Sequence, residues 1–223
     1  MFLPLAVLAS SKVVIEGEAP MQDLNQLQLK AEVGKVNIEG GKTDRVRWRV
    51  ELEPKGGWFT SAQSVQEKLK GIRVVSEIDG NILSLKLDYP PGVDHDDCKQ
   101  NWEVELPAVL GLNVKHGVGS LHVAGLTGGV DVESGVGEVK VDVPAGGVRA
   151  KVGVGDVNVV SATGSLGDID LHAGVGDASA RVAGKDLAAR RAGPEAKLSY
   201  TNDGDDNYRL SADVGNVQLR VEN

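Results

Sequence analysis

The sequence predicts an all-β protein, built as a β-solenoid or β-helix-like stack of short strands. Two observations lead to this fold class. A Gly-Val-Gly tripeptide recurs at residues 117–119, 135–137, 153–155 and 174–176, at intervals of 18, 18 and 21 residues. Each copy opens a segment in which apolar and polar residues alternate, which is the period of a half-buried strand. A fixed period of this length is typical of stacked repeats, in which each repeat buries its apolar face against the next.

Composition agrees with a narrow β stack. The 223 residues include 29 glycines and only 4% aromatic residues, so the core must consist of Val, Leu, Ile and Ala. A formal net charge of −8 repels phosphate groups, which argues against nucleic acid and anionic membrane surfaces as partners. The single cysteine, Cys98, excludes an intrachain disulfide.

The first residues predict export. The apolar stretch Met1–Ala9 is typical of the end of a secretory signal that lacks its basic start, and we expect residues 1–11 to be a truncated signal segment. The alternative is an N-terminal strand from Phe2 to Leu8. The stretch is far shorter than the roughly 20 residues of a spanning helix. We therefore predict an exported protein (periplasm, cell surface or secreted) that is not transmembrane.

Residues 12–111 predict an N-terminal β portion that caps the stack. Expected strands lie within 24–38 about a turn at Val33-Gly34, over Val46–Leu52, over Val74–Ile78 and Ile82–Leu87 about an Asp79-Gly80 turn, and over Trp102–Leu106. The segment Ser61–Lys70 predicts the one short helix, because Ser61 suits the N-cap and Gly71 follows as a stop.

Residues 112–223 predict the glycine-rich repeats, continuous with the first portion in one domain. Each repeat holds two short strands, and a degenerate copy returns at residues 214–219. Stacked coils bring equivalent outward residues into columns about 4.8 Å apart. We expect one column of Asp131, Arg149 and Asp170 with alternating charge, and a second of Glu133, Lys151 and His172. Opposite charges on neighbouring strands contribute about 0.2–1 kcal/mol per pair.

The organisation resembles the bacterial putative-adhesin family of unknown function. The resemblance is carried by "NWEVELPAVLGLNVKHGVGSLHVAGLTGGVDVESGVGEVKVDV" from Asn101, with serial Gly-x-Gly-acidic-hydrophobic steps, and by "LQLKAEVGKVNIEGG" earlier in the chain. Nearly the full mature chain is covered. The resemblance implies an exported glycine-rich β fold, and it supplies no catalytic residues.

An acidic column is the sharpest candidate site. Glu138, Asp156 and Asp177 each follow a Gly-Val-Gly copy directly, and in-register stacking would form a carboxylate ladder. A Ca²⁺ ion would relieve the repulsion between these charges, which is about 1 kcal/mol per pair in water. The alternative is that each Asp hydrogen-bonds its own turn. The sequence thus predicts a Ca²⁺ site at these three residues. If each Asp hydrogen-bonds its own turn instead, we expect no cofactor.

Other motifs predict structure rather than chemistry. No helix follows the Gly-Val-Gly copies, which excludes a dinucleotide site, and hydrolase and P-loop motifs are missing. His116, His122 and His172 are expected on the surface. The stretches 94–98 and 202–207 contain metal-compatible side chains but predict solvated turns. Gly56–Phe59 predicts a hydrophobic anchor or, alternatively, a carbohydrate-contacting tip.

These observations predict a non-catalytic surface or periplasmic binding module whose partner is an unknown protein or glycan surface. The first alternative is a self-associating envelope scaffold, because solenoid ends expose strand edges that pair with another copy. A calcium-stabilised repeat protein and a carbohydrate-active β-helix are further alternatives. Activity in the latter would depend on the column of Glu138, Asp156 and Asp177.

Overall fold

A computed structural model describes residues 12–55, 67, 69–95 and 98–222 of the chain. It confirms the all-β prediction. The predicted signal segment 1–11 and the tip at Gly56–Phe59 lie outside the described residues. The helix expected over Ser61–Lys70 lies mostly outside them too: Glu67 and Leu69 are helical, but the described residues contain no complete helix. No helix within the described ranges is long and apolar enough to span a membrane.

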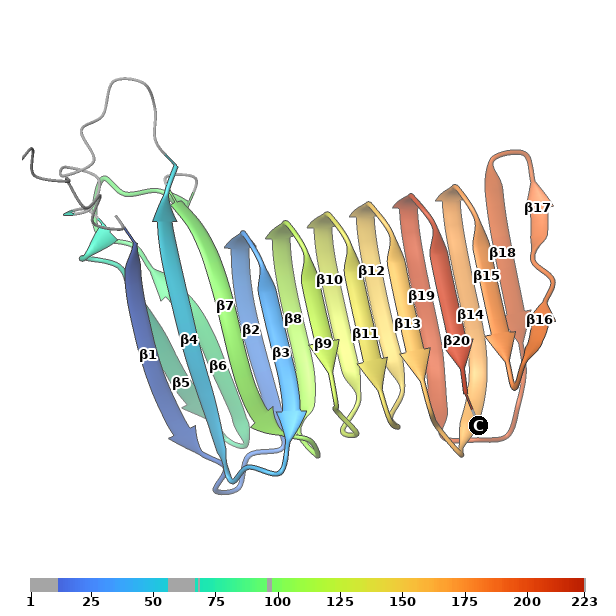
Figure 1. Cartoon of the computed structure of the whole chain (residues 1–223), viewed down its shortest axis with the longest axis horizontal. Helices are drawn as coiled ribbons and strands as arrows, with labels where there is room; N and C mark the ends of the chain where they lie inside the picture. The colour runs from blue at the N-terminus through green and yellow to red at the C-terminus, as the bar shows by residue number, and fades with distance from the viewer. Residues whose placement is uncertain (1–11, 56–66, 68, 96–97, 223) are drawn as a thin grey trace, which may run out of the picture.

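The strands form two ten-stranded sheets that face each other along one elongated stack (Figure 1). Sheet A runs, in spatial order, β1 (Val13–Pro20), β4 (Arg45–Pro54), β7 (Cys98–Pro107), β3 (Val36–Gly41), β9 (Leu121–Ala124), β11 (Val139–Val143), β13 (Val157–Ser161), β20 (Val217–Val221), β15 (Ala178–Val182) and β16 (Lys185–Leu187). Sheet B runs β17 (Arg190–Ala192), β18 (Glu195–Tyr200), β14 (Leu166–Val175), β19 (Asp206–Val214), β12 (Val148–Val154), β10 (Val130–Val136), β8 (Gly111–Val118), β2 (Gln26–Val33), β6 (Ile82–Asp88) and β5 (Arg73–Asp79).

Each Gly-Val-Gly copy lies at a corner, where the chain passes from sheet B to sheet A. The strands before it and after it belong to different sheets, and each pairs in parallel with the equivalent strand of the neighbouring coil. Strands β2 and β3 already form such a coil, because they pair in parallel with β8 and β9. The stacked pairing therefore begins before residue 112.

The core fills the space between the two sheets with columns of like residues. One inward column of sheet B joins Leu27, Leu112, Val130, Val148, Tyr208 and Ile169. One inward column of sheet A joins Val36, Leu121, Val139, Val157, Val217 and Ala178. All of these side chains are buried. Burying a Val or Leu stabilises the fold by about 1.5–3 kcal/mol, so each coil contributes little alone and much as part of the stack.

The coils do not stack in the order of the sequence. After β15 the chain forms β16, β17 and β18, and then returns as β19 and β20 between the coil of β12–β13 and the coil of β14–β15. The expected contact of Arg149 with Asp170 is therefore wrong. Arg149 pairs with Arg209, which in turn pairs with Asp170, while the predicted pair Asp131–Arg149 is confirmed. The same insertion separates Lys151 from His172 by Ser211.

Antiparallel strands close the described ends of both sheets. At one end β1 pairs with β4 and β5 with β6, and at the other β16 pairs with β15 and β17 with β18. The strands β16 and β17 are only three residues long. Short edge strands hinder pairing with another chain. The prediction of homo-association through strand edges is not tested by this arrangement, but the structure offers little edge for it at that end.

The second glycine of each Gly-Val-Gly copy allows the coils to approach closely. These glycines and their equivalents form the column Gly34, Gly119, Gly137, Gly155, Gly215 and Gly176, all with φ between +136° and +145°. In this region only glycine is unstrained. A Cβ on Gly137 would overlap the carbonyl oxygen of Gly119 in the next coil. The amide of Gly137 meanwhile donates to the carbonyl of Val154 at 2.9 Å, which continues the ladder around the corner.

Replacing Gly137 by alanine should therefore destabilise the stack strongly. Backbone strain and overlap with Gly119 together predict a loss of about 3 kcal/mol or more in the free energy of unfolding. The matched control is Gly41→Ala, because no atom lies within 4 Å of a Cβ at that position. Urea denaturation measures both variants. Equal stability of Gly137→Ala and Gly41→Ala would contradict this account of the repeat.

Candidate functional site

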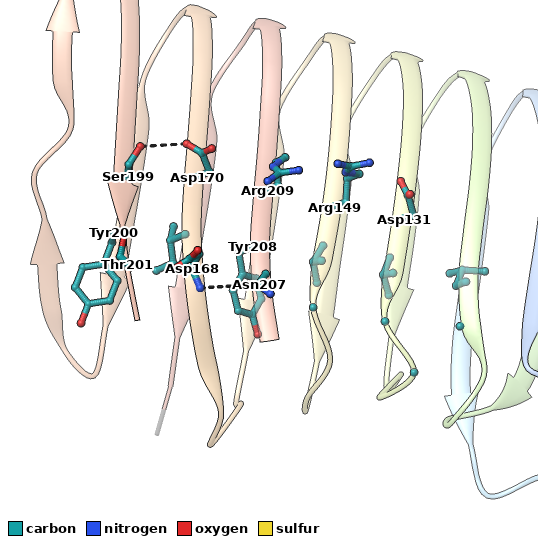
Figure 2. A pocket seen from close by; sticks show the side chains of 18 of the residues that line it. Asp131, Arg149, Asp168, Asp170, Ser199, Tyr200, Thr201, Asn207, Tyr208 and Arg209 are labelled. Carbon is teal, nitrogen blue, oxygen red and sulfur yellow. Dashed lines mark hydrogen bonds between the residues drawn. The ribbon is translucent and has the colours of Figure 1, made fainter. Parts of the chain in front are cut away.

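A groove lies on the outer face of sheet B. Its volume is about 680 Å³, and it crosses the beginnings of the parallel strands β8, β10, β12, β19 and β14 before ending at β18 (Figure 2). Gly111, at the start of β8, lines it together with Gly129 and Gly147, which directly precede β10 and β12. At these three neighbouring positions no side chain fills the groove.

A row of four charged side chains and one serine borders this glycine floor. In spatial order it runs Asp131, Arg149, Arg209, Asp170 and Ser199, one residue from each successive strand (Figure 2). The hydroxyl of Ser199 donates to the carboxylate of Asp170 at 3.1 Å. Burial raises the pKa of Asp131, an effect that the nearby Arg149 partly offsets. The row therefore presents two cations flanked by two carboxylates.

Hydrogen bonds brace the end of the groove at β18. Tyr200 also lines this end and is 38% exposed, but its partner on β14 is the buried Ile169. Asn207 accepts a hydrogen bond from the amide of Asp168 at 2.8 Å, and the carboxylate of Asp168 accepts from the amide of Asn202 at 3.2 Å. The loop 202–207, predicted to be a solvated turn, thus uses its amide groups to hold this end of the groove together.

The acidic column is not a continuous ladder. The coil of β19 and β20, here called the returning coil, places Asn216 between Asp156 and Asp177. The amide groups of Asn216 donate to Asp156 Oδ1 at 2.7 and 3.1 Å, and its side-chain oxygen accepts from the amide of Asp177 at 3.1 Å. Asp177 also pairs with Arg191, and Glu138 accepts from Asn158 at 3.3 Å.

Asn216 thus stands where two carboxylates were expected to meet. Among the described residues, no three His, Cys, Asp or Glu side chains gather closely enough to hold a metal ion. The expected direct contact of Asp156 with Asp177 is wrong, because the chain inserts an amide between them. The calcium site at Glu138, Asp156 and Asp177 stays a prediction.

A second surface feature follows from the middle residue of each Gly-Val-Gly copy. These valines and their equivalents form one column across sheet B, here called the valine column: Val33, Val118, Val136, Val154, Val214 and Val175. The last five of these side chains are 45–51% exposed, although they are among the most regularly repeated apolar residues of the sequence. Sequence reasoning missed this column because strand alternation usually places a repeated valine in the core.

The histidines differ in their environments. His172 Nε2 lies 2.9 Å from Glu195 on an exposed face, and His122 lies on an outward position of β9, as expected. His116 was expected at the surface, but it is buried, with 4% of its surface exposed. It occupies an inward position beside Ala31 and Ser134 in neighbouring coils. The prediction failed because strand β8 begins before the first Gly-Val-Gly copy and carries His116 into the core.

The stretch 94–98 falls partly outside the described residues. Within the described part, Asp94 accepts a hydrogen bond from the amide of His95 at 2.8 Å. Cys98 is buried at the start of β7. Asp94 and His95 thus precede the strand, whereas Cys98 belongs to it.

Comparison with solved structures indicates the fold. A putative cell adhesion protein from Clostridium sporogenes superposes with a TM-score of 0.61 at 17% sequence identity, over 95% of this chain and 100% of that chain. A putative adhesin from Bacteroides fragilis covers 94% of this chain and 97% of that chain at 14% identity, with a TM-score of only 0.37. No protein-family model matches the chain, and neither does any curated protein. The first likeness shows a common fold.

The buried His116 should make stability depend on pH. Burial lowers its pKa below the usual 6.5, and the nearby Gly34 backbone and Glu32 carboxylate offset only part of this effect. Neither ring nitrogen has a hydrogen-bond partner of normal geometry among the described residues. The unfolded chain therefore binds the proton more readily, so the stability present above pH 6.5 is lost as the pH falls below it.

We expect the wild type to lose stability through this group as the pH falls from 7 to 5. A His116→Val variant removes the titrating ring from the same inward position. Its free energy of unfolding should fall less over this range than that of the wild type, as measured by urea denaturation at each pH. Parallel pH profiles for the two proteins would show that His116 is not a source of acid sensitivity.

Proposed function

We propose that this chain is an exported, non-catalytic binding module of the β-solenoid kind, which holds a saccharide chain in the groove on sheet B. The observation that carries the proposal is the groove itself, with its floor of Gly111, Gly129 and Gly147. A flat backbone floor lets a sugar ring lie close to the sheet. The row from Asp131 to Ser199 supplies donors and acceptors for hydroxyl groups along one side.

The shape of the groove supports a saccharide as the ligand. The groove is open and extends across several strands, so it suits a linear chain better than a compact cofactor. The cell-adhesion description of the Clostridium sporogenes structure is compatible with a surface binding role.

The proposal of a non-enzyme follows from how the carboxylates are used. Asp156 is bonded to Asn216, Asp177 to Arg191, and Asp170 to Ser199, so each is held by a partner. Glycoside hydrolysis needs a pair of carboxylates directed at one bond. Turnover of a saccharide that depends on one of these side chains would overturn this part of the proposal.

Filling the groove should abolish saccharide binding without unfolding the protein. Gly111 suits the test, because its φ is not left-handed and a Cβ there would meet its nearest neighbours at 3.4 Å. We expect Gly111→Gln to weaken the affinity for a saccharide found on a glycan array at least tenfold. The matched control is Gly41→Gln on sheet A, where a Cβ has open space. The proposal fails if no glycan binds, or if Gly111→Gln binds as tightly as the wild type.

A second candidate function, self-association, is favoured by the valine column. Its valines lie in register on successive strands about 4.8 Å apart, so a second copy offers the same spacing to every one of them. Exposed apolar surface of this regularity is a common mark of an interaction surface. In this candidate the copies associate side by side through their corners, not end to end through strand edges.

Substitutions can distinguish self-association through the valine column from self-association through a strand edge. We expect a variant with Val118→Thr, Val136→Thr and Val154→Thr to show a lower average mass than the wild type in sedimentation equilibrium at high concentration. Threonine keeps the shape and the β preference of valine, so the fold should be retained. The control is Val14→Thr, which changes a 42% exposed valine on the edge strand β1. A strictly monomeric wild type would exclude this candidate.

A further inference from the structure

The returning coil brings two arginines together in the middle of the groove. Arg149 on β12 and Arg209 on β19 are direct partners in a parallel ladder, so their backbones lie about 4.8 Å apart. Both side chains are exposed and border the glycine floor (Figure 2). Asp131 and Asp170 occupy the next position on either side. The order of charges along the row is therefore negative, positive, positive, negative.

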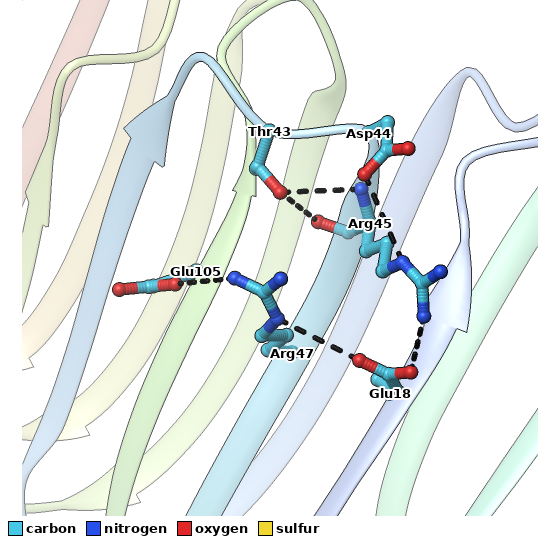
Figure 3. Close-up of polar contacts among 6 residues, drawn as sticks. All are labelled: Glu18, Thr43, Asp44, Arg45, Arg47 and Glu105. Atoms are coloured by element: carbon cyan, nitrogen blue, oxygen red, sulfur yellow. Dashed lines mark hydrogen bonds and ion pairs between the residues drawn. The ribbon is translucent and has the colours of Figure 1, made fainter.

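This pair differs from the arginines of sheet A. There, Arg47 lies 3.6 Å from Glu18 and 3.5 Å from Glu105, so carboxylates on both neighbouring strands surround it (Figure 3). Within the described ranges, no ion pair of this kind, with atoms within 4.0 Å, holds Arg149 or Arg209. Like charges directly opposite on neighbouring strands destabilise a sheet. The groove thus contains two adjacent cations that no described carboxylate holds within 4.0 Å, although Arg149 acts electrostatically on Asp131.

We propose that Arg149 and Arg209 together bind the carboxylate of an acidic sugar, a hexuronate residue within a glycan chain. A guanidinium presents its donors as a planar fork that matches a carboxylate with two parallel hydrogen bonds. Two forks side by side can hold one carboxylate between them. This inference names the ligand class of the groove and so rests on the proposed function.

The flanking groups favour a carboxylated sugar over other anions. Asp131 and Asp170 accept hydrogen bonds from sugar hydroxyls, whereas they repel a second negative charge near the arginines. The net charge of −8 likewise disfavours a dense polyanion such as a nucleic acid. A glycan that carries one carboxylate on every second sugar places a single negative charge near the arginines and is not a dense polyanion. Its uncharged rings would lie over the glycine floor.

The test uses the full chain and two matched hexasaccharides in titration calorimetry. One alternates glucuronate with N-acetylglucosamine, and the other consists of N-acetylglucosamine alone. We expect the wild type to bind the acidic hexamer at least tenfold more tightly, with an advantage that shrinks as salt rises from about 50 to about 300 mM. Arg149→Gln and Arg209→Gln should each remove most of this advantage and leave the neutral hexamer within about twofold.

The control for lost charge is Arg73→Gln, on the edge strand β5, where Arg73 pairs with Asp88 at 3.4 Å. It should bind both hexamers as the wild type does. Thermal melts check that the groove variants stay folded, and removal of one of two adjacent like charges should leave the melting temperature unchanged or raise it.

The outcomes separate this inference from the proposed function. Equal binding of the acidic and neutral hexamers, unaffected by Arg149→Gln and Arg209→Gln, would overturn the inference and leave saccharide binding standing. Binding of the acidic hexamer that Arg73→Gln weakens as much as Arg149→Gln would also overturn it, because the attraction would then depend on overall charge. Binding of neither hexamer, together with failure of every saccharide on the array, would overturn both.

Discussion

The structure depends on the close, in-register approach of one coil to the next at the glycine corners. Gly137 has a backbone conformation that other residues rarely adopt, and its amide donates to Val154 in the neighbouring coil. Because the corner is held this tightly, the strands on both sides of it continue the same register. Each position of the repeat then becomes a column that crosses the sheet. The core columns, the groove floor and the valine column are all consequences of this one constraint.

Because equivalent residues of the repeat line up on adjacent strands, a small feature of one residue becomes a continuous feature of the surface. A single glycine is a small gap, but Gly111, Gly129 and Gly147 at the beginnings of adjacent strands make a continuous floor. A half-exposed valine is an ordinary feature of a surface, but five in register make an apolar line. The two surfaces belong to different parts of sheet B, with the floor at the beginnings of the strands and the valines at their ends. Saccharide binding and self-association can therefore be disturbed independently.

Much of the fold follows from local patterns, whereas the order of the coils does not. The Gly-Val-Gly period and the alternation after it correctly predict the strands, the inward columns and the pair Asp131–Arg149. The period states which residues are equivalent, but it does not state which coil lies beside which. The last coil, with Arg209 and Asn216, stacks between two earlier ones through contacts distant in sequence. For this reason the sequence predicts neither the arginine pair of the groove nor the amide between Asp156 and Asp177.

Core packing explains how the fold can tolerate two adjacent arginines in the groove. Like charges on adjacent strands cost a sheet an amount comparable to the 0.2–1 kcal/mol that opposite charges contribute, which is small beside the roughly 5–15 kcal/mol that stabilises a domain. The inward neighbours of Arg149 and Arg209, Val148 and Tyr208, are buried, and Tyr208 bonds to Ser161 of the other sheet at 2.7 Å. Core packing thus holds the two arginines beside each other regardless of their repulsion. A carboxylate that binds between them recovers this cost and forms charge-assisted hydrogen bonds, so the same geometry that slightly weakens the free protein favours the complex.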